Sequence, residues 1–109
     1  MPAVQFTDQD FEAQVLKNKL PVMVDFYAEW CGPCKLAGPV VDKLAEDYKD
    51  KMTIGKIDVD ANQVTSGKFG VMSIPTVIIF KDGKEMERMS GFGGEEGYLR
   101  LIKKVLGES

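Results

Sequence analysis

The fold is decided by residues 21–45, which read PVMVDFYAEWCGPCKLAGPVVDKLA. Residues 21–28 are mostly apolar and rich in β-branched and aromatic side chains, a pattern typical of a strand that is buried on both faces. Apolar residues then recur at helical spacing over residues 36–48, with charged residues between them. This order predicts a buried strand that leads through a short turn into a helix, and the turn holds Cys31 and Cys34.

Cys31 and Cys34 are the only cysteines of the chain. As a structural disulfide they would close a loop of four residues, worth about 2 kcal/mol through chain entropy, and would tie no distant elements together. Two alternatives stay open at this point: incidental core cysteines, or half of a zinc site that a second chain completes. We favour reversible thiol–disulfide exchange, because the pair lies where a strand meets a helix.

The start of this helix predicts different roles for the two thiols. We expect Gly32 to be the N-cap and Pro33 to take the first helical position, where a missing N–H costs nothing. Cys31 would then face free N–H groups and the positive end of the helix dipole, which lowers its pKa and makes it the nucleophile. Cys34, shielded inside the first turn, would be the resolving thiol. Gly32 and Pro33 would also set the relative stability of dithiol and disulfide.

Length, composition and charge exclude several other classes of protein. With 109 residues the chain has the size of one domain, and we expect residues 1–109 to form it. The absence of histidine excludes a Ser-His-Asp triad and a histidine-ligated zinc site within the chain, and we expect no metal. A net charge of −3 argues against nucleic-acid binding. Without a secretory signal or an apolar run of roughly 18 to 20 residues, a cytoplasmic protein that does not bind membranes is expected.

Asp25 is the only charged residue in the apolar strand and lies six positions before Cys31. One interpretation is an edge strand that leaves Asp25 in water. The other is a buried carboxylate whose pKa is raised by desolvation. A carboxylate of the second kind can accept the proton of Cys34 while that thiol attacks a mixed disulfide.

The rest of the chain alternates strand and helix patterns. A capping box with Asp in place of Glu, TDQD at residues 7–10, opens the first predicted helix. An Asp-Gly turn at residues 81–84 predicts a hairpin. The remaining predicted elements are helix 11–16, strand 52–59, helix 60–69, strand 76–80, edge strand 85–90 and helix 94–106. The order βαβαβαββα predicts an α/β fold, a single domain with a central mixed sheet covered by helices on both faces.

Residues 24–35, VDFYAEWCGPCK, with IPT at 74–76 and FKDG at 80–83, resemble the thioredoxin family over nearly the whole chain. The resemblance implies the thioredoxin fold and a cytoplasmic protein-disulfide reductase that serves cell redox homeostasis. It implies no cofactor beyond the Cys31–Cys34 disulfide. A separate thioredoxin reductase must restore the dithiol, because the chain has no glycine-rich dinucleotide motif. The implied partners are this reductase and proteins with reducible disulfides. The resemblance also implies that the protein is a monomer.

The resemblance also assigns roles that the residues alone leave open. Lys56 by default is a solvated lysine, and by resemblance it approaches the buried Asp25 and steadies its charge. Ile74-Pro75 by default is an ordinary proline at a strand start, and by resemblance is a cis peptide whose preceding backbone pairs with an extended substrate. Trp30 is either a packing aromatic or part of the partner-binding face. The expected substrate-binding residues are Trp30, Val59, Ser73, Ile74, Pro75, Gly91 and Phe92.

Three positions depart from the family pattern, namely Tyr27, Ser90 and Phe92, and all three bear on partner preference rather than on the chemistry. Two alternative functions remain at this stage. The first is a disulfide oxidase or isomerase on the same fold, although such enzymes usually carry histidine between the cysteines. The second is a thioredoxin-fold binding subunit in which the thiols are incidental.

Overall fold

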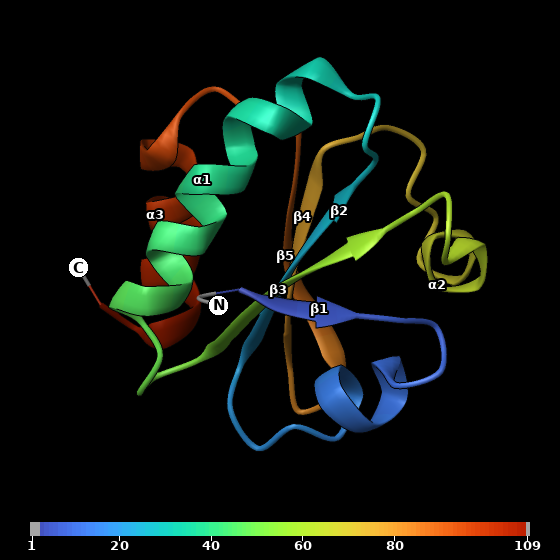
Figure 1. Cartoon of the computed structure of the whole chain (residues 1–109). Helices are drawn as coiled ribbons and strands as arrows, with labels where there is room; N and C mark the ends of the chain where they lie inside the picture. Colours follow the sequence, from blue (N-terminus) through green and yellow to red (C-terminus); the bar gives the residue numbers. More distant parts are fainter. Residues whose placement is uncertain (1–2, 109) are drawn as a thin grey trace.

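The computed structural model describes residues 3–108 and contains strands and helices in the predicted order βαβαβαββα. Figure 1 shows these elements as one layered domain. The five strands are β1 (Val4–Phe6), β2 (Val22–Tyr27), β3 (Thr53–Asp58), β4 (Thr76–Lys81) and β5 (Lys84–Ser90). The helices are η1 (Glu12–Leu16), α1 (Gly32–Asp47), α2 (Gln63–Lys68) and α3 (Glu95–Leu106).

The strands form one mixed sheet in the order β1-β3-β2-β4-β5. β3 pairs in parallel with β1 and β2, whereas β4 pairs antiparallel with β2 and β5. β2 therefore lies at the centre of the sheet, which explains why its residues Val22–Phe26 are all buried. Cys31 and Cys34 follow shortly after the end of this central strand, which is hydrogen-bonded to a neighbouring strand on each side.

Helices cover both faces of the sheet, as the sequence predicts. Figure 1 shows α1 and α3 on one face and η1 with α2 on the other. Successive side chains of β2 point to opposite faces. Met23 packs in the core beneath α1 and α3 with Val41 and Ile102, and Val24 packs in the other core with Phe11. Burial on both faces accounts for the nearly continuous apolar sequence of β2.

The capping box at residues 7–10 is confirmed, but the helix after it is of another kind. Thr7 N–H donates to Asp10 Oδ1 at 2.8 Å, and Asp10 N–H donates to Thr7 Oγ1 at 3.3 Å. η1 is a short π-helix, in which Lys17 N–H donates to Glu12 O, five residues back, at 2.9 Å. The wider turn still buries Phe11, at 4% exposure.

The predicted helix over residues 60–69 begins late. The Asp58 carboxylate accepts hydrogen bonds from the backbone N–H of Asp60 at 2.9 Å and of Ala61 at 3.4 Å. This local turn competes with helix formation, so α2 starts only at Gln63. Gly70, with φ of 62°, follows its last turn as predicted.

The predicted hairpin is confirmed in its turn and its edge. Asp82 and Gly83 both have positive φ, 54° and 79°, as the tight turn of a two-residue loop requires. β5 lies at the edge of the sheet and exposes most of its side chains, which explains its many charged residues.

Candidate active site at the start of helix α1

The two cysteines lie at the first turn of α1 and form a disulfide, with their Cα atoms 5.2 Å apart. Cys31 has the extended backbone of an N-cap residue, with φ of −85° and ψ of 115°. Our expectation that Gly32 is the N-cap is therefore wrong by one position, since Gly32 is already helical. Pro33 remains within the first turn, where its missing N–H leaves no hydrogen bond unmade.

The sulfur of Cys31 itself caps the helix. Cys34 N–H donates to Cys31 Sγ at 3.2 Å, in the way that a serine or aspartate oxygen accepts at other helix starts. This N–H and the helix dipole favour negative charge on Cys31 once the disulfide is reduced. The shielding that we expected to distinguish the thiols is absent in the disulfide form, because Cys31 is 4% and Cys34 5% exposed. Their polar surroundings distinguish them instead.

Asp25 is buried beneath this turn, on the central strand rather than at an edge. It is 1% exposed, and neither carboxylate oxygen has a hydrogen-bond partner among the described residues. Burial raises the pKa of Asp25 to about 7, with the charge of Asp42 adding to the rise and Lys56 opposing it. Asp25 can therefore hold or release a proton near neutral pH, as a general base requires.

A cavity of about 230 Å³ brings Asp25 and Cys34 together. A space of this size admits water. Cys34, Lys35 and Gly38 of α1 form part of its wall. The residues that line it are Gln5, Asp25, Tyr27, Ala28, Glu29, Cys34, Lys35, Gly38 and Lys56.

Lys56 lies beside Asp25, although its ammonium pairs elsewhere. The two residues are direct partners in the parallel register of β2 and β3. Lys56 Nζ is 3.2 Å from Asp42 Oδ1 on α1, and no ion pair joins it to Asp25. Lys56 and Asp25 are therefore neighbours in the sheet without an ion pair between them. The residue that sequence reasoning missed here is Asp42.

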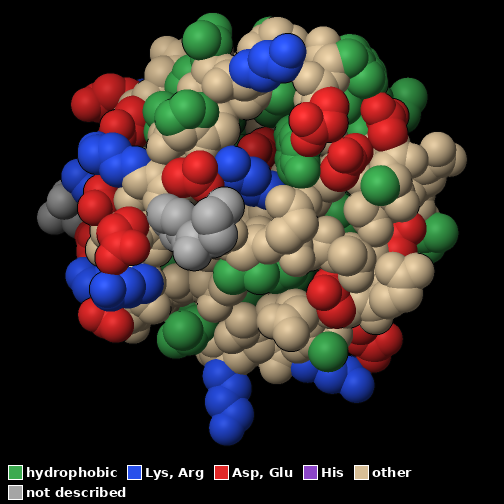
Figure 2. Space-filling model, viewed as in Figure 1, with side chains coloured by type: hydrophobic (Ala, Val, Ile, Leu, Met, Phe, Trp, Pro, Cys, Tyr) green, Lys and Arg blue, Asp and Glu red, His purple; other side chains and the backbone are tan. Residues whose placement is uncertain are grey.

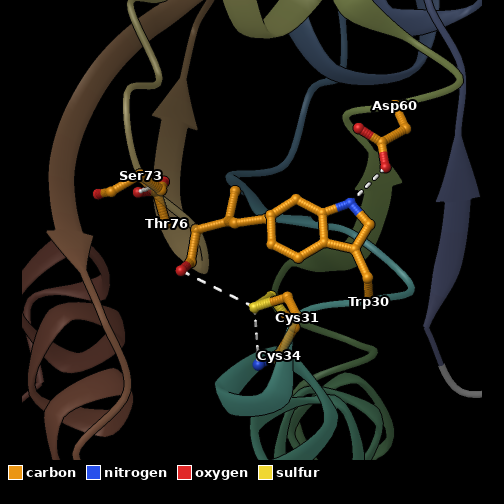
Figure 3. The surroundings of a disulfide bond; sticks show 7 residues. Trp30, Cys31, Cys34, Asp60, Ser73 and Thr76 are labelled. Atoms are coloured by element: carbon orange, nitrogen blue, oxygen red, sulfur yellow. Dashed lines mark hydrogen bonds between the residues drawn. A yellow bond between two sulfur atoms is a disulfide. The ribbon is translucent and has the colours of Figure 1, made fainter.

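On the other side of the dithiol lies a second cavity, of about 280 Å³, that holds four of the predicted substrate-binding residues: Trp30, Val59, Ser73 and Ile74. Trp30 is 70% exposed, and its Nε1 donates to Asp60 Oδ2 at 2.7 Å. Figure 3 shows the indole between Asp60 and the segment from Ser73 to Thr76. Trp30 is therefore a surface residue held in place by a polar contact, and not a packing aromatic.

Asp60 and Met72 also line this second cavity, and sequence reasoning singled out neither. Met72 is 94% exposed beside Ile74. An exposed methionine next to the IPT segment, and an acidic residue just after the end of a strand, are the signals that point to them.

The peptide bond between Ile74 and Pro75 is cis, as the family resemblance implied. Ile74 O lies 3.9 Å from Cys31 Sγ, so the backbone before the proline faces the disulfide. Gly91 N–H donates to Pro75 O at 2.7 Å, which joins the predicted Gly91 to this segment.

Phe92, in contrast, is not among the residues that line either of these two cavities. Its ring packs against Tyr98 of α3 with centroids 5.4 Å apart, and it lies half-buried against the core on that face.

The sheet of five strands with helices on both faces, and the dithiol at a helix start over a buried carboxylate, define a thiol–disulfide oxidoreductase. The described residues contain no group of three or more Cys, Asp or Glu side chains that could hold a metal ion. Within residues 3–108 no helix is long and apolar enough to cross a membrane.

A model of the family described as Thioredoxin matches residues 2–104. The thioredoxin of Bacillus subtilis (strain 168) is 47% identical over 106 residues, which are 97% of this chain and all of that protein. The thioredoxin of Staphylococcus aureus (strain N315) is 45% identical over the same shares. That of Mycobacterium tuberculosis (strain H37Rv) is 43% identical over 94% of this chain and 89% of its own.

The chain belongs to the thioredoxin family. It is accordingly a protein-disulfide reductase with a redox-active Cys31–Cys34 pair. Thioredoxins need no cofactor beyond this disulfide.

Proposed function

We propose that Cys31 is the attacking thiol of this reductase, that Cys34 resolves the mixed disulfide, and that Asp25 accepts the proton of Cys34. This division of roles between the two cysteines is supported by the different surroundings of their side chains. Cys31 Sγ accepts the N–H of Cys34, whereas Cys34 lines the cavity that contains the unpaired carboxylate of Asp25.

The reaction then runs in two exchanges. The Cys31 thiolate attacks one sulfur of a substrate disulfide, a mixed disulfide forms, and the other substrate sulfur leaves as a thiolate that takes up a proton. Cys34 gives its proton to Asp25 and attacks Cys31 Sγ. The second substrate thiolate leaves, two electrons have passed to the substrate, and the Cys31–Cys34 disulfide remains. Asp25 returns its proton through the cavity beneath α1.

The substrate is proposed to bind as an extended segment across a groove beside Cys31 that includes the second cavity. Ser73, Ile74 and the backbone before Pro75 would pair with its main chain, as in strand addition. Trp30 and Val59 would contact its apolar side chains. Gly91 would support this surface through its hydrogen bond to Pro75 O. We also carry over Phe92 as a substrate-binding residue; its ring packs on Tyr98.

We further propose that residues 1–109 form one domain, that the protein acts as a monomer in the cytoplasm, and that a thioredoxin reductase restores its dithiol. Gly32 and Pro33 are proposed to tune the redox potential from the first turn of α1. Neither nucleic acid nor membrane is proposed as a partner. On the face viewed in Figure 2, basic side chains are interspersed with acidic ones, which is consistent with this view.

The division of roles is tested by trapping. Cys34→Ser should accumulate a mixed disulfide with insulin or with a labelled disulfide peptide, whereas Cys31→Ser should form none. Insulin reduction by dithiothreitol should be accelerated by the wild-type chain and not by Cys31→Ser. Equal activity of Cys31→Ser would instead favour a binding subunit with incidental thiols. An equilibrium potential close to that of strongly oxidising dithiols would favour an oxidase.

A further inference from the structure

We propose that Asp42 is a positioning residue, which holds the Lys56 ammonium in an ion pair on α1 and so keeps Asp25 free to carry a proton. The inference deepens the proposed function, since it rests on the role of Asp25 as proton acceptor. Its subject is a carboxylate that neither borders the dithiol nor lines the cavity in which Cys34 would be deprotonated.

The first step is the path of the Lys56 side chain. Lys56 is the register partner of Asp25, so both side chains leave the sheet on the α1 face. The ammonium then passes Gly38, where an added Cβ would lie 3.5 Å from Nζ. It ends at Asp42 Oδ1, 3.2 Å away and one helical turn beyond Gly38. The side chain is thus laid along α1 toward the outside of the cavity.

The second step follows from this path: without Asp42, the nearest carboxylate open to the Lys56 ammonium would be that of Asp25. Lys56 lines the same cavity as Asp25, whose two oxygens have no hydrogen-bond partner among residues 3–108. The Lys56 side chain is only 21% exposed, so without Asp42 its ammonium would gain most by pairing with the buried, unpaired carboxylate of Asp25. In the structure the Lys56 ammonium is instead paired with the carboxylate of Asp42.

The third step is the effect on Asp25. Two charged residues act on this carboxylate in opposite directions: Asp42 raises the pKa of Asp25 and Lys56 lowers it. Among residues 3–108, the ionisable groups that line the cavity or interact electrostatically with Asp25 are Tyr27 on β2, Glu29 before α1, Cys34, Lys35 and Asp42 on α1, Lys56 on β3 and Tyr98 on α3. An ammonium within about 4–6 Å of a carboxylate lowers its pKa by about 1–3 units. A base shifted down by that much would take the Cys34 proton poorly at neutral pH.

The test is the titration of the Asp25 carboxyl carbon, followed by ¹³C NMR in the oxidised protein. Asp42→Asn should lower the midpoint by about one unit, a tenfold loss of proton affinity. Asp42→Glu, which keeps the carboxylate, should leave the midpoint close to the wild-type value. Asp47→Asn is the matched control, because Asp47 lies on the same helix and its only ion pair among the described residues is an exposed one with Lys43, 4.0 Å long. It should leave the midpoint unchanged.

A double-mutant cycle separates the ion pair from the bare charge of Asp42. In the Lys56→Met background, Asp42→Asn should shift the midpoint by less than half as much as in the wild-type background. An equal shift in both backgrounds, or no shift in either, overturns the proposal. A shifted midpoint together with an unshifted pH profile for mixed-disulfide resolution supports the positioning by Asp42 and overturns the proton-acceptor role of Asp25.

Discussion

The backbone N–H of Cys34 donates to the sulfur of Cys31 across 3.2 Å, so the helix that follows the dithiol is capped by the sulfur that we propose as the nucleophile. In most helices this position holds a hydroxyl or carboxylate oxygen whose purpose is structural. Here the same geometry would stabilise a Cys31 thiolate in the reduced protein, so under the proposed mechanism one interaction both caps the helix and activates the nucleophile.

We therefore expect Cys31 to be alkylated selectively. In the reduced protein at pH 7, iodoacetamide should modify Cys31 at least about tenfold faster than Cys34, because thiolate is the reactive species and only Cys31 faces the helix N-terminus. Peptide mass spectrometry after short exposures measures both rates. In guanidinium chloride, where α1 is unfolded, the two rates should become similar. Faster labelling of Cys34 in the folded chain would contradict the assignment.

The burial of Asp25 should destabilise the protein as the pH rises. Its pKa is about 7 in the folded chain and about 3.8 as the reference value, so between these two pH values the folded state keeps a proton that the unfolded state has lost. Stability falls with pH across that window and levels off above it. Asp25→Asn should remove the fall and be more stable at pH 8 by as much as about 4 kcal/mol. Urea unfolding of both proteins at pH 4, 6 and 8 measures this, and equal differences at all three values would refute it.

The same substitution should slow catalysis at a single step. With Asp25→Asn, release of the second product from a preformed mixed disulfide should slow by roughly 100-fold between pH 6 and 8, because Cys34 loses its proton acceptor. Formation of the mixed disulfide should change little. Stopped-flow measurement of each step separates them, with Asp50→Asn as the control at an exposed carboxylate. Unchanged resolution in Asp25→Asn across this pH range would exclude the proposed role.

Trp30 should matter for protein substrates and not for folding. It is 70% exposed beside the second cavity, so Trp30→Ala should raise KM for a protein disulfide by about tenfold, as loss of an aromatic contact at an interface does. Reduction of a small aromatic disulfide should be nearly unaffected. Met86→Ala, at an exposed site on β5, serves as the control and should leave both KM values as they are. A fall in kcat with unchanged KM would contradict this role.

Gly55 should be required for the β1–β3 pair. A Cβ at this position would lie 2.5 Å from the Phe6 ring and from Val4 O, so Gly55→Ala should cost about 2 kcal/mol through overpacking. Gly67, inside α2, has open space around it, and Gly67→Ala should stabilise the chain by about 0.5–1 kcal/mol. The midpoints of urea unfolding compare the two. Equal effects of the same sign would show that packing does not decide at Gly55.

The sequence predicts the strand, turn and helix around the dithiol because local patterns determine them. Apolar periodicity identifies β2 and α1, and a lone carboxylate in a buried strand marks Asp25. The cis bond before Pro75 came only from the family resemblance, because trans is the more common form. The one-residue error at the N-cap arose because cysteine is not among the usual capping residues, and glycine is.

The contacts of long side chains could not be predicted. Lys56 reaches Asp42 across the gap between a strand and a helix, and Trp30 reaches Asp60 across the second cavity. Each pair joins segments that are adjacent only in three dimensions, and each depends on a rotamer that no periodicity encodes. Phe92 shows the same limit, since the contact of its ring with Tyr98 of α3 could not be read from the sequence.

The Cα atoms of Cys31 and Cys34 are 5.2 Å apart because the cap and first turn of a helix fix them there, and this spacing lies in the ordinary range for a disulfide. The scaffold that holds the oxidised pair is thus provided by backbone hydrogen bonds rather than by the sulfur–sulfur bond. Passing two electrons therefore demands little reorganisation of the main chain. Such a carrier can alternate between donor and acceptor many times on an almost stationary frame.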